Sequence, residues 1–336
     1  MTITNQAGER RTIETALHTL LTVEDDAAGN QGLRDKLRFL QTKLTSGQLH
    51  LAVLGQMKRG KSSFINAILG GEILPTGVLP VTAVITEIRY GPAPDATIIY
   101  STGGMRERVD LSTPADYITE AGNPGNKKQV ASVEIAYPST FLENGIVLID
   151  TPGIGSTHIH NTQTTEKYLE QVDAGIVVLS MDPPITEVES TFLKDIKDRI
   201  PKLFFIVNKT DAASSEEAQN IKCFLESELD RLQFETAEIF LLSARNGLQE
   251  KRQASCALLS SGLDAFEQRL RSFLLKEKTQ VLVLSVALDV LHIARMVKFA
   301  AAIGVRAMEM SPQELQSKKL ALDELLERTE VEVREL

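Results

Sequence analysis

Apolar positions change their spacing at residue 49 of the chain. They recur at helical spacing over residues 8–48, whereas short continuous apolar runs, such as 146–149 and 175–179, follow further on. Runs of this length are typical of strands that are buried on both faces of a parallel sheet. The pattern predicts strands at 50–54, 81–90, 96–101, 130–136, 145–149, 175–180, 203–207 and 238–242. It predicts helices after residue 62 and at 163–172, 187–199, 215–232 and 261–275.

Strands that alternate with helices predict an α/β fold with a doubly wound, mostly parallel sheet, which binds its ligand at the carboxyl ends of the strands. The segment 91–135 contains Gly-Pro, Gly-Gly and Asn-Pro-Gly turns and is predicted to be an inserted hairpin. After residue 276 the strand pattern stops, and two long helices are predicted at 277–309 and 312–336. No helix stop signal precedes Leu336, so we expect a longer native chain.

Composition narrows the class of protein. The formal net charge is -9, which disfavours a general nucleic-acid binder, because such proteins usually carry a basic excess. The two cysteines make no disulfide framework or zinc pattern, and the N-terminus lacks the order of a signal peptide, so we expect a cytoplasmic protein. The longest apolar stretch, 281–305, is interrupted by Asp289, Arg295 and Lys298, which favours burial in a helical bundle over membrane insertion.

The segment 55–62 has the spacing G-x-x-x-x-G-K-S between a predicted strand and a predicted helix, which is the pattern of a phosphate-binding loop. Glycines let the backbone curl so that successive N–H groups face phosphate oxygens, and the helix that follows adds its positive end. Lys61 is predicted to reach the β- and γ-phosphates, and Ser62 to bind Mg²⁺. The predicted nucleotide-binding residues of this loop are Gly55, Gln56, Met57, Lys58, Arg59, Gly60, Lys61, Ser62 and Ser63.

Two further motifs each follow a predicted strand. Asp150 and Gly153 form a D-x-x-G sensor, in which Asp150 is predicted to hold Mg²⁺ and the Gly153 N–H to approach the γ-phosphate. Asn208, Lys209 and Asp211 form an N-K-x-D motif, in which the Asp211 carboxylate accepts two hydrogen bonds from guanine groups that adenine lacks. The motifs therefore predict that the chain binds GTP and GDP.

Weaker signals extend the predicted site. Thr82 is predicted to close over Mg²⁺ and the γ-phosphate; without the other motifs, an ordinary strand residue would explain it equally well. The segment after residue 242 is predicted to be a short loop that covers the guanine, formed by Ser243, Ala244 and Arg245. The predicted metal ligands are Ser62, Thr82 and Asp150. One solvated acidic helix face is predicted for Glu187, Glu189, Asp195 and Asp198.

The residue after the sensor glycine limits the catalytic mechanism. Small Ras-like enzymes orient the attacking water with a glutamine, whereas this chain has Ile154 directly after Gly153. Isoleucine neither orients nor deprotonates water, so catalysis comes from another residue or is absent. Gln56 is the available candidate.

The stretches 55–63, 69–77 and 79–84 resemble the amino-terminal GTPase domain of the dynamin superfamily. The resemblance is closest to bacterial dynamin-like proteins, with mitofusins as a related branch. It implies N-terminal neck helices at 1–48, a dynamin-type GTPase domain at 49–275 and C-terminal neck helices at 276–336, so that a helical neck bundle is appended to the α/β domain.

The resemblance also implies an activity and partners. The chain would hydrolyse GTP with Mg²⁺, form a homodimer through its GTPase domains, with higher oligomers left open, and couple hydrolysis to neck movement in membrane fusion or fission. Membrane lipid would be bound through parts absent from this chain, no nucleic acid is expected, and the protein would be cytoplasmic and peripheral to a membrane. Two alternatives stay open: a signalling or assembly GTPase without a membrane role, and a scaffold that binds GTP but barely hydrolyses it.

Single residues can be matched to the family pattern. The resemblance gives Gln56 the role of helping to position the catalytic water and Thr82 that of the switch threonine. Many dynamins have small hydroxyl residues at the positions of Met57 and Lys58, one of which helps to bind a charge-compensating monovalent cation, and Met57 cannot replace it. Either Lys58 or Arg59 supplies the positive charge, or both side chains project to solvent or to the dimer partner. The predicted catalytic residues are Gln56, Lys58, Lys61 and Thr82.

Overall fold

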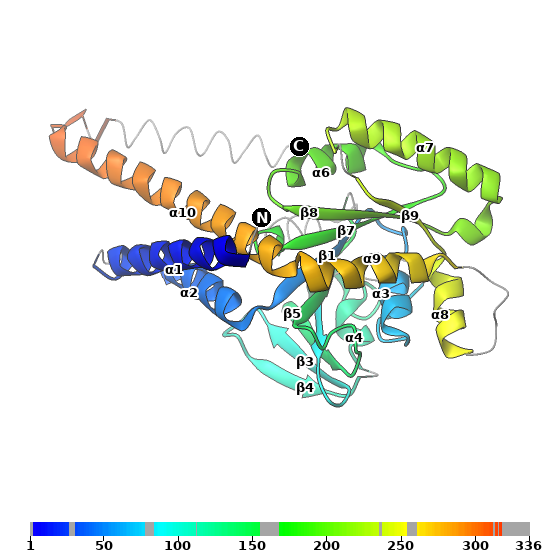
Figure 1. Cartoon of the computed structure of the whole chain (residues 1–336). Coiled ribbons are helices and arrows are strands. Elements are labelled where there is room, and N and C mark those ends of the chain that lie inside the picture. Colours follow the sequence, from blue (N-terminus) through cyan, green and yellow to red (C-terminus); the bar gives the residue numbers. More distant parts are fainter. Residues whose placement is uncertain are drawn as a thin grey trace. The chain divides into compact units, whose positions relative to one another are not determined.

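A mixed, mostly parallel sheet of nine strands positions the sequence motifs, and its strand order is β4-β3-β5-β2-β6-β1-β7-β8-β9 (Figure 1). The strands are β1 (Leu49–Leu54), β2 (Ile85–Tyr90), β3 (Asp95–Tyr100), β4 (Arg106–Val109), β5 (Val130–Tyr137), β6 (Ile146–Asp150), β7 (Ala174–Ser180), β8 (Lys202–Asn208) and β9 (Ile239–Leu241). β1 runs parallel to both of its neighbours, β6 and β7. The carboxyl end of β1 therefore lies between that of β6, which precedes the sensor, and that of β7, which precedes the loop of residues 181–186.

The structure is a computed structural model that describes residues 3–26, 31–77, 84–111, 113–154, 168–234, 237–253, 261–311, 313–314 and 316–317. The chain divides into two compact units, Met1–Leu288 and Asp289–Leu336. The domain limits at 48 and 275, which we inferred from the sequence, stay predictions.

Helices account for most of the remaining structure. They are α1 (Ile3–Asp26), α2 (Gln31–Ser46), α3 (Lys61–Leu69), α4 (Ala115–Ile118), α6 (Glu187–Ile196), α7 (Ser215–Arg231), α8 (Ala244–Arg252), α9 (Leu263–Lys276) and α10 (Lys278–Glu309), with short 3-10 helices η1 (Pro124–Asn126) and η2 (Thr210–Ala212). The long predicted helices at 187–199, 215–232, 261–275 and 277–309 are confirmed within a few residues at their ends. The segment 318–336, which was predicted to be helical, lies outside the described residues.

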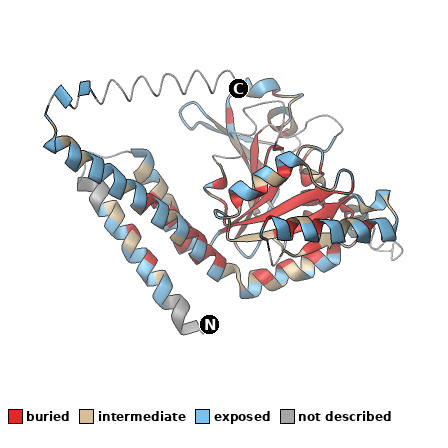
Figure 2. Cartoon of the chain, turned by 90° about the horizontal axis from the view of Figure 1, so that it is seen from above, coloured by how far each residue is buried: buried red, intermediate tan, exposed pale blue. Residues whose placement is uncertain are grey.

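Helices pack on both faces of the sheet. Because successive residues of a strand point to opposite sides, neighbouring residues of one strand contact helices on opposite faces. In β8, the Phe204 ring packs edge-on against Phe266 and Phe273 of α9, with ring centroids 6.1 and 5.2 Å apart. The next residue, Phe205, contacts Phe234 and belongs to the core beneath α6 and α7. Buried residues accordingly concentrate in the strands (Figure 2). The predicted doubly wound α/β sheet is thereby confirmed.

The apolar pattern missed one strand. β4 carries the charged sequence Arg106-Glu107-Arg108 and pairs only with β3, as an antiparallel edge strand. Its side chains form cross-strand ion pairs, Arg106 with Glu134 and Arg108 with Asp95, in place of apolar contacts. β3 and β4 together form the hairpin that was predicted within 91–135, and α4 and η1 occupy part of the remainder.

α10 is long and apolar enough to cross a membrane by length and composition, and part of its most apolar stretch is buried. One helix of this kind does not distinguish a membrane span from a core helix of a soluble protein. Its first turns belong to the first unit, where Val281 and Val286 are buried. Lys278 Nζ donates hydrogen bonds to the carbonyl oxygens of Asn144 and Gly145, which lie just before β6.

Candidate nucleotide site

The loop between β1 and α3 has the backbone that its two glycines permit. Gly55 has a φ of 143°, and a Cβ there would lie 2.5 Å from the carbonyl oxygen of Val178. Gly60 has a φ of 91°, and a Cβ there would lie 2.4 Å from Asn208 Nδ2. Both positions therefore require glycine, one because β7 is too close and the other because Asn208 of the N-K-x-D motif is too close.

Lys61 begins α3 and points back into the loop. Its Nζ donates to the carbonyl oxygens of Gly55 and Gln56, at 3.0 and 3.3 Å. Burial lowers the pKa of this lysine to about 8, and the negative charge of Asp150 opposes the shift. Phosphate oxygens next to Nζ would stabilise the ammonium further, so the side chain suits the predicted anion.

A hydroxyl and a carboxylate meet beside this lysine. Ser62 Oγ donates to Asp150 Oδ2 at 2.8 Å, and Asp150 is almost completely buried at the end of β6. The next residue, Thr151, donates its hydroxyl proton to the Val53 carbonyl and so ties the sensor to β1. Oxygen ligands of this kind are the ones that Mg²⁺ prefers, so the residues present fit the predicted metal. The third predicted ligand, Thr82, lies outside the described residues.

The sensor lies directly against the phosphate-binding loop. A Cβ at Gly153 would be 2.7 Å from both the N and the Cα of Met57, so only glycine allows this approach. Ile154 forms an isolated parallel bridge with Gln56, and its N–H donates to the Gly55 carbonyl at 3.3 Å. The Ile154 side chain is 2% exposed and therefore serves as a packing residue in this position.

Asn208 joins three segments of the site. Its Nδ2 donates to the Arg59 carbonyl at 3.1 Å, while its Oδ1 accepts from the backbone N–H groups of Lys209 and Ala244, at 2.8 and 3.0 Å. Lys209 has a φ of 66°, and its Nζ donates to the Lys58 carbonyl at 2.7 Å. The phosphate-binding loop is thus held by two residues of the N-K-x-D motif.

Asp211 and the segment after β9 lie on the other side of Asn208. Asp211 is exposed in η2, so its carboxylate is accessible to a base. The prediction of a loop at 243–245 is wrong for Ala244 and Arg245, because Ser243 is the N-cap of α8 and accepts a hydrogen bond from Asn246 N. The predicted cover of this segment over guanine stays a prediction. Ala244 and Arg245 form the first turn of that helix. The helix was missed because only Ala244 and Gly247 of its polar sequence are buried.

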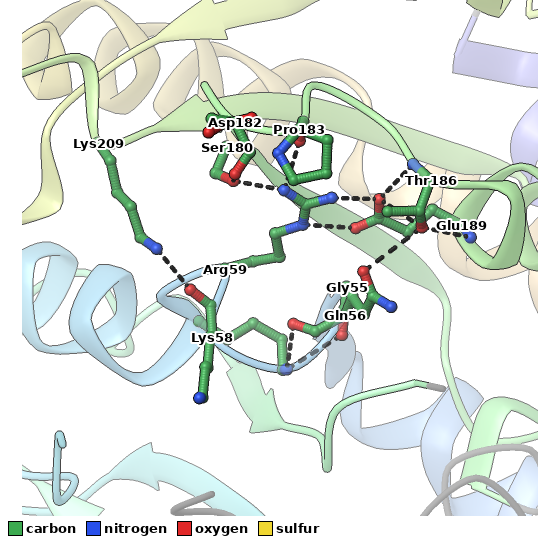
Figure 3. Close-up of polar contacts among 11 residues, drawn as sticks. Gly55, Gln56, Lys58, Arg59, Ser180, Asp182, Pro183, Thr186, Glu189 and Lys209 are labelled. Carbon is green, nitrogen blue, oxygen red and sulfur yellow. Dashed lines mark hydrogen bonds and ion pairs between the residues drawn. The ribbon is translucent and has the colours of Figure 1, made fainter. Parts of the chain in front are cut away.

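Arg59 neither projects to solvent nor points at the phosphate-binding backbone (Figure 3). Its guanidinium forms a two-pronged ion pair with Glu189, at 2.8 Å from Nε to Oε1 and 2.6 Å from Nη2 to Oε2. Nη1 donates to Ser180 Oγ and, at 2.6 Å, to the Pro183 carbonyl. Both charged side chains are at most 4% exposed. Arg59 therefore has neither of the two arrangements considered from the sequence, because it forms a buried ion pair within the chain. Of the two basic residues Lys58 and Arg59, Lys58 is the exposed one.

Glu189 also corrects the prediction of a solvated acidic face. Glu187, Asp195 and Asp198 are exposed, but Glu189 shares the buried face of α6 with Leu193 and Ile196. The spacing of these three residues, four and then three apart, is the signal in the sequence that placed the carboxylate on the apolar face. Ser63 lies in the first turn of α3 and is half-buried.

The fold and these motifs define a nucleotide-binding domain of the P-loop GTPase class. Residues 51–211 match the model of the dynamin family, which spans the loop, the sensor and the guanine-reading motif. This segment, about half of the chain, belongs to the dynamin family.

The chain is also similar to individual proteins. The chain is 41% identical over 248 residues to an uncharacterized protein encoded in the xynA 3′ region of Caldicellulosiruptor sp., with 73% of this chain and 61% of that protein covered. It is 33% identical over 200 residues to the bacterial dynamin-like protein of Nostoc punctiforme, with coverage of 56% and 29%. The chain thus spans less than two thirds of the length of either relative.

A solved structure shows the same fold. An oligomerised bacterial dynamin pair, described as providing a mechanism for the long-range sensing and tethering of membranes, superposes with a TM-score of 0.59 at 18% identity. The superposition covers 100% of this chain and 53% of that one.

Proposed function

We propose that this chain binds GTP with Mg²⁺ and hydrolyses it to GDP and phosphate. The observation that carries the proposal is the convergence of Lys61, Ser62 and Asp150 at the end of β1, next to a sensor glycine packed on the loop. This arrangement gathers the cation, the hydroxyl and the carboxylate that phosphoryl transfer needs within one small site.

Each residue has a defined part in the reaction. The backbone N–H groups of the loop and Lys61 bind the β- and γ-phosphates and stabilise the charge that develops on them. Ser62 and Asp150, together with Thr82, would hold Mg²⁺, which neutralises phosphate charge when bound. Gln56 helps to place the attacking water, because Ile154 carries no polar atom for that task. Asp211 selects guanine.

Dimerisation across the GTPase domains would complete the site. Arg59 is held by Glu189, so Lys58 is the exposed cation of the loop that is available for transition-state charge, either in its own site or in that of a partner. We propose that turnover is slow in the monomer and rises when a second copy orders the loop and excludes water. Higher oligomers are compatible with the same arrangement.

A role in membrane remodelling is the finer part of the proposal. It is supported by the bacterial dynamin-like relatives and by the structural similarity to a dynamin pair described as tethering membranes. Relaxation of the sensor and of the Thr82 segment after hydrolysis would move the helices at both ends of the domain, at a membrane to which the protein is peripheral. The competing function, a scaffold that binds GTP without turning it over, is favoured by Ile154.

GTP turnover as a function of protein concentration tests the proposal. We expect the activity per molecule to rise with concentration, and GDP with aluminium fluoride to produce dimers that GDP alone does not. Gln56→Ala should lower kcat, and Asp211→Asn should weaken selection of GTP over other nucleotides. GTP binding with negligible turnover at every concentration, by a protein that stays monomeric, would favour the scaffold.

A further inference from the structure

The loop of residues 181–186 and the first turn of α6 contact the phosphate-binding loop through a closed polar network (Figure 3). None of the nucleotide motifs includes these residues. The network starts at Arg59 and ends at the side chain of Gln56, the residue to which we assign the placement of water. Its geometry bears directly on how that side chain is held.

Glu189 is the centre of the network. Its Oε2 accepts hydrogen bonds from Arg59 Nη2 at 2.6 Å, from Thr186 N at 2.9 Å and from Thr186 Oγ1 at 3.0 Å. Its Oε1 accepts from Arg59 Nε at 2.8 Å. One carboxylate therefore fixes both the arginine of the phosphate-binding loop and the N-cap residue of α6.

Helix capping alone does not explain why this carboxylate is buried. α7 starts with the same capping box, formed by Ser214 and Glu217, and there both residues are exposed. In α6 the corresponding glutamate is 1% exposed and is paired with Arg59. A buried charge is costly unless it is paired, so the burial of Glu189 goes with its contact to the loop rather than with the cap.

Thr186 carries the contact from Glu189 to Gln56. The Thr186 hydroxyl has one proton, which it shares between Glu189 Oε2 at 3.0 Å and Gln56 Oε1 at 3.4 Å, the second contact being at the long end of hydrogen-bond distances. The backbone of Gln56 is fixed independently by its bridge to Ile154. The hydroxyl therefore acts on the orientation of the side-chain amide.

We propose that Thr186 and Glu189 are positioning residues for Gln56. The ion pair between Arg59 and Glu189 holds the amino end of α6 against the phosphate-binding loop, and the Thr186 hydroxyl then orients the Gln56 amide toward the attacking water. Neither residue belongs to one of the nucleotide motifs. The inference rests on the proposed GTP hydrolysis and on the role of Gln56 in it.

The first test compares Thr186→Val, Thr186→Ser and wild type in the full chain. Valine keeps the shape of threonine and removes the hydroxyl, so we expect kcat to fall roughly three- to tenfold, the effect of one lost hydrogen bond. The Kd values for GDP and for a non-hydrolysable GTP analogue should change less than about twofold. Serine should restore most of kcat. Ser214→Ala, which removes the same kind of cap from α7, is the matched control and should leave kcat unchanged.

The decisive readout is additivity with Gln56→Ala. If Thr186 acts through Gln56, adding Thr186→Val to Gln56→Ala should lower kcat no further, and Glu189→Gln should behave alike wherever it folds. Effects of Thr186→Val and Gln56→Ala that multiply would overturn the inference and leave the proposed function intact. An unchanged kcat in Thr186→Val would do the same. Wild-type protein that binds GTP without hydrolysing it would overturn the proposed function and, with it, this inference.

Discussion

Two buried ion pairs lie at opposite ends of the central strands and differ in kind. At the carboxyl ends, both oxygens of Glu189 accept directed hydrogen bonds from the Arg59 guanidinium. At the amino ends, Lys43 Nζ of α2 lies 2.8 Å from Asp173 Oδ1, which accepts no hydrogen bond of good geometry in the described part of the chain. Lys43 instead directs a hydrogen bond to the Gln171 carbonyl, at 2.7 Å.

The difference follows from the chemistry of the two cations. A guanidinium fits a carboxylate in one planar arrangement, whereas an ammonium is a point charge that tolerates several. The arginine pair therefore fixes a geometry, which suits a site where a side chain must be oriented. The lysine pair holds α2 to the residue before β7 mainly by charge. The other oxygen, Asp173 Oδ2, accepts a hydrogen bond from His50 N of β1 at 2.8 Å.

Removing one charge from either pair should produce the largest loss of stability. Asp173→Asn should lower the free energy of unfolding by about 3–5 kcal/mol, because it leaves a buried ammonium without its counter-ion. Glu189→Gln should cost a similar amount for the same reason. Urea unfolding of both variants measures the effect, and a loss below about 1 kcal/mol would mean that water reaches these groups.

Neutralising both partners of a pair distinguishes its contribution to stability from its contribution to kcat. In Lys43→Met with Asp173→Asn, no buried charge remains and the amide still accepts from His50 N, so most of the lost stability should return with kcat near wild type. In Arg59→Met with Glu189→Gln, stability should return while kcat stays low. Equal recovery of kcat at both pairs would remove the functional distinction between them.

His50, which lies beside the lysine pair, should make stability depend on pH, with a smaller effect. The pKa of His50 is lowered below its ordinary 6.5, first by burial and then by the positive charge of Lys43, while Asp173 and Glu87 oppose the shift. The unfolded chain therefore binds a proton at His50 before the folded chain does. Stability should be full above about pH 6.5 and fall as the pH drops from there toward the folded pKa.

Urea unfolding between about pH 5.5 and 7.5 measures this slope. His50→Gln removes the titrating group and should flatten the dependence in that window. An unchanged slope in this variant would assign the pH dependence to other groups.

The smallest effect is expected at an exposed pair on the same helix. Lys36 lies two turns before Lys43 in α2 and contacts Glu170 at 2.6 Å, with the glutamate side chain 59% exposed. Lys36→Ala should change the free energy of unfolding by at most about 1 kcal/mol, because solvent screens the interaction. If Lys36→Ala lost as much stability as Asp173→Asn, the location of an ion pair between α2 and β7, and not its burial, would determine its contribution to the free energy of unfolding.

Local patterns predicted where the proposed nucleotide motifs lie in the fold. Each motif stands where a continuous apolar run ends, so its place at the end of a strand follows from its immediate neighbours. The contact between Arg59 and Glu189 joins residues 130 positions apart, and no local pattern specifies such a partner. β4 was not predicted because it is a charged edge strand whose side chains form ion pairs with residues of other strands. α8 was not predicted because so few of its residues are buried. The alignment of Glu189 with Leu193 and Ile196 is a signal of burial that the prediction of a solvated acidic face did not use.

The amide of Asn208 uses both of its ends on protein backbone, and this has a consequence for the proposed discrimination among nucleotides. One side chain clamps residues 59, 209 and 244, which belong to the phosphate end and the base end of the site. A base that displaces residues 209–211 would therefore also displace Asn208, whose hydrogen bond to residue 59 helps to shape the phosphate-binding loop. A poorly matched base would then weaken the binding of the triphosphate as well, so that the site would select against it at both the base and the phosphates.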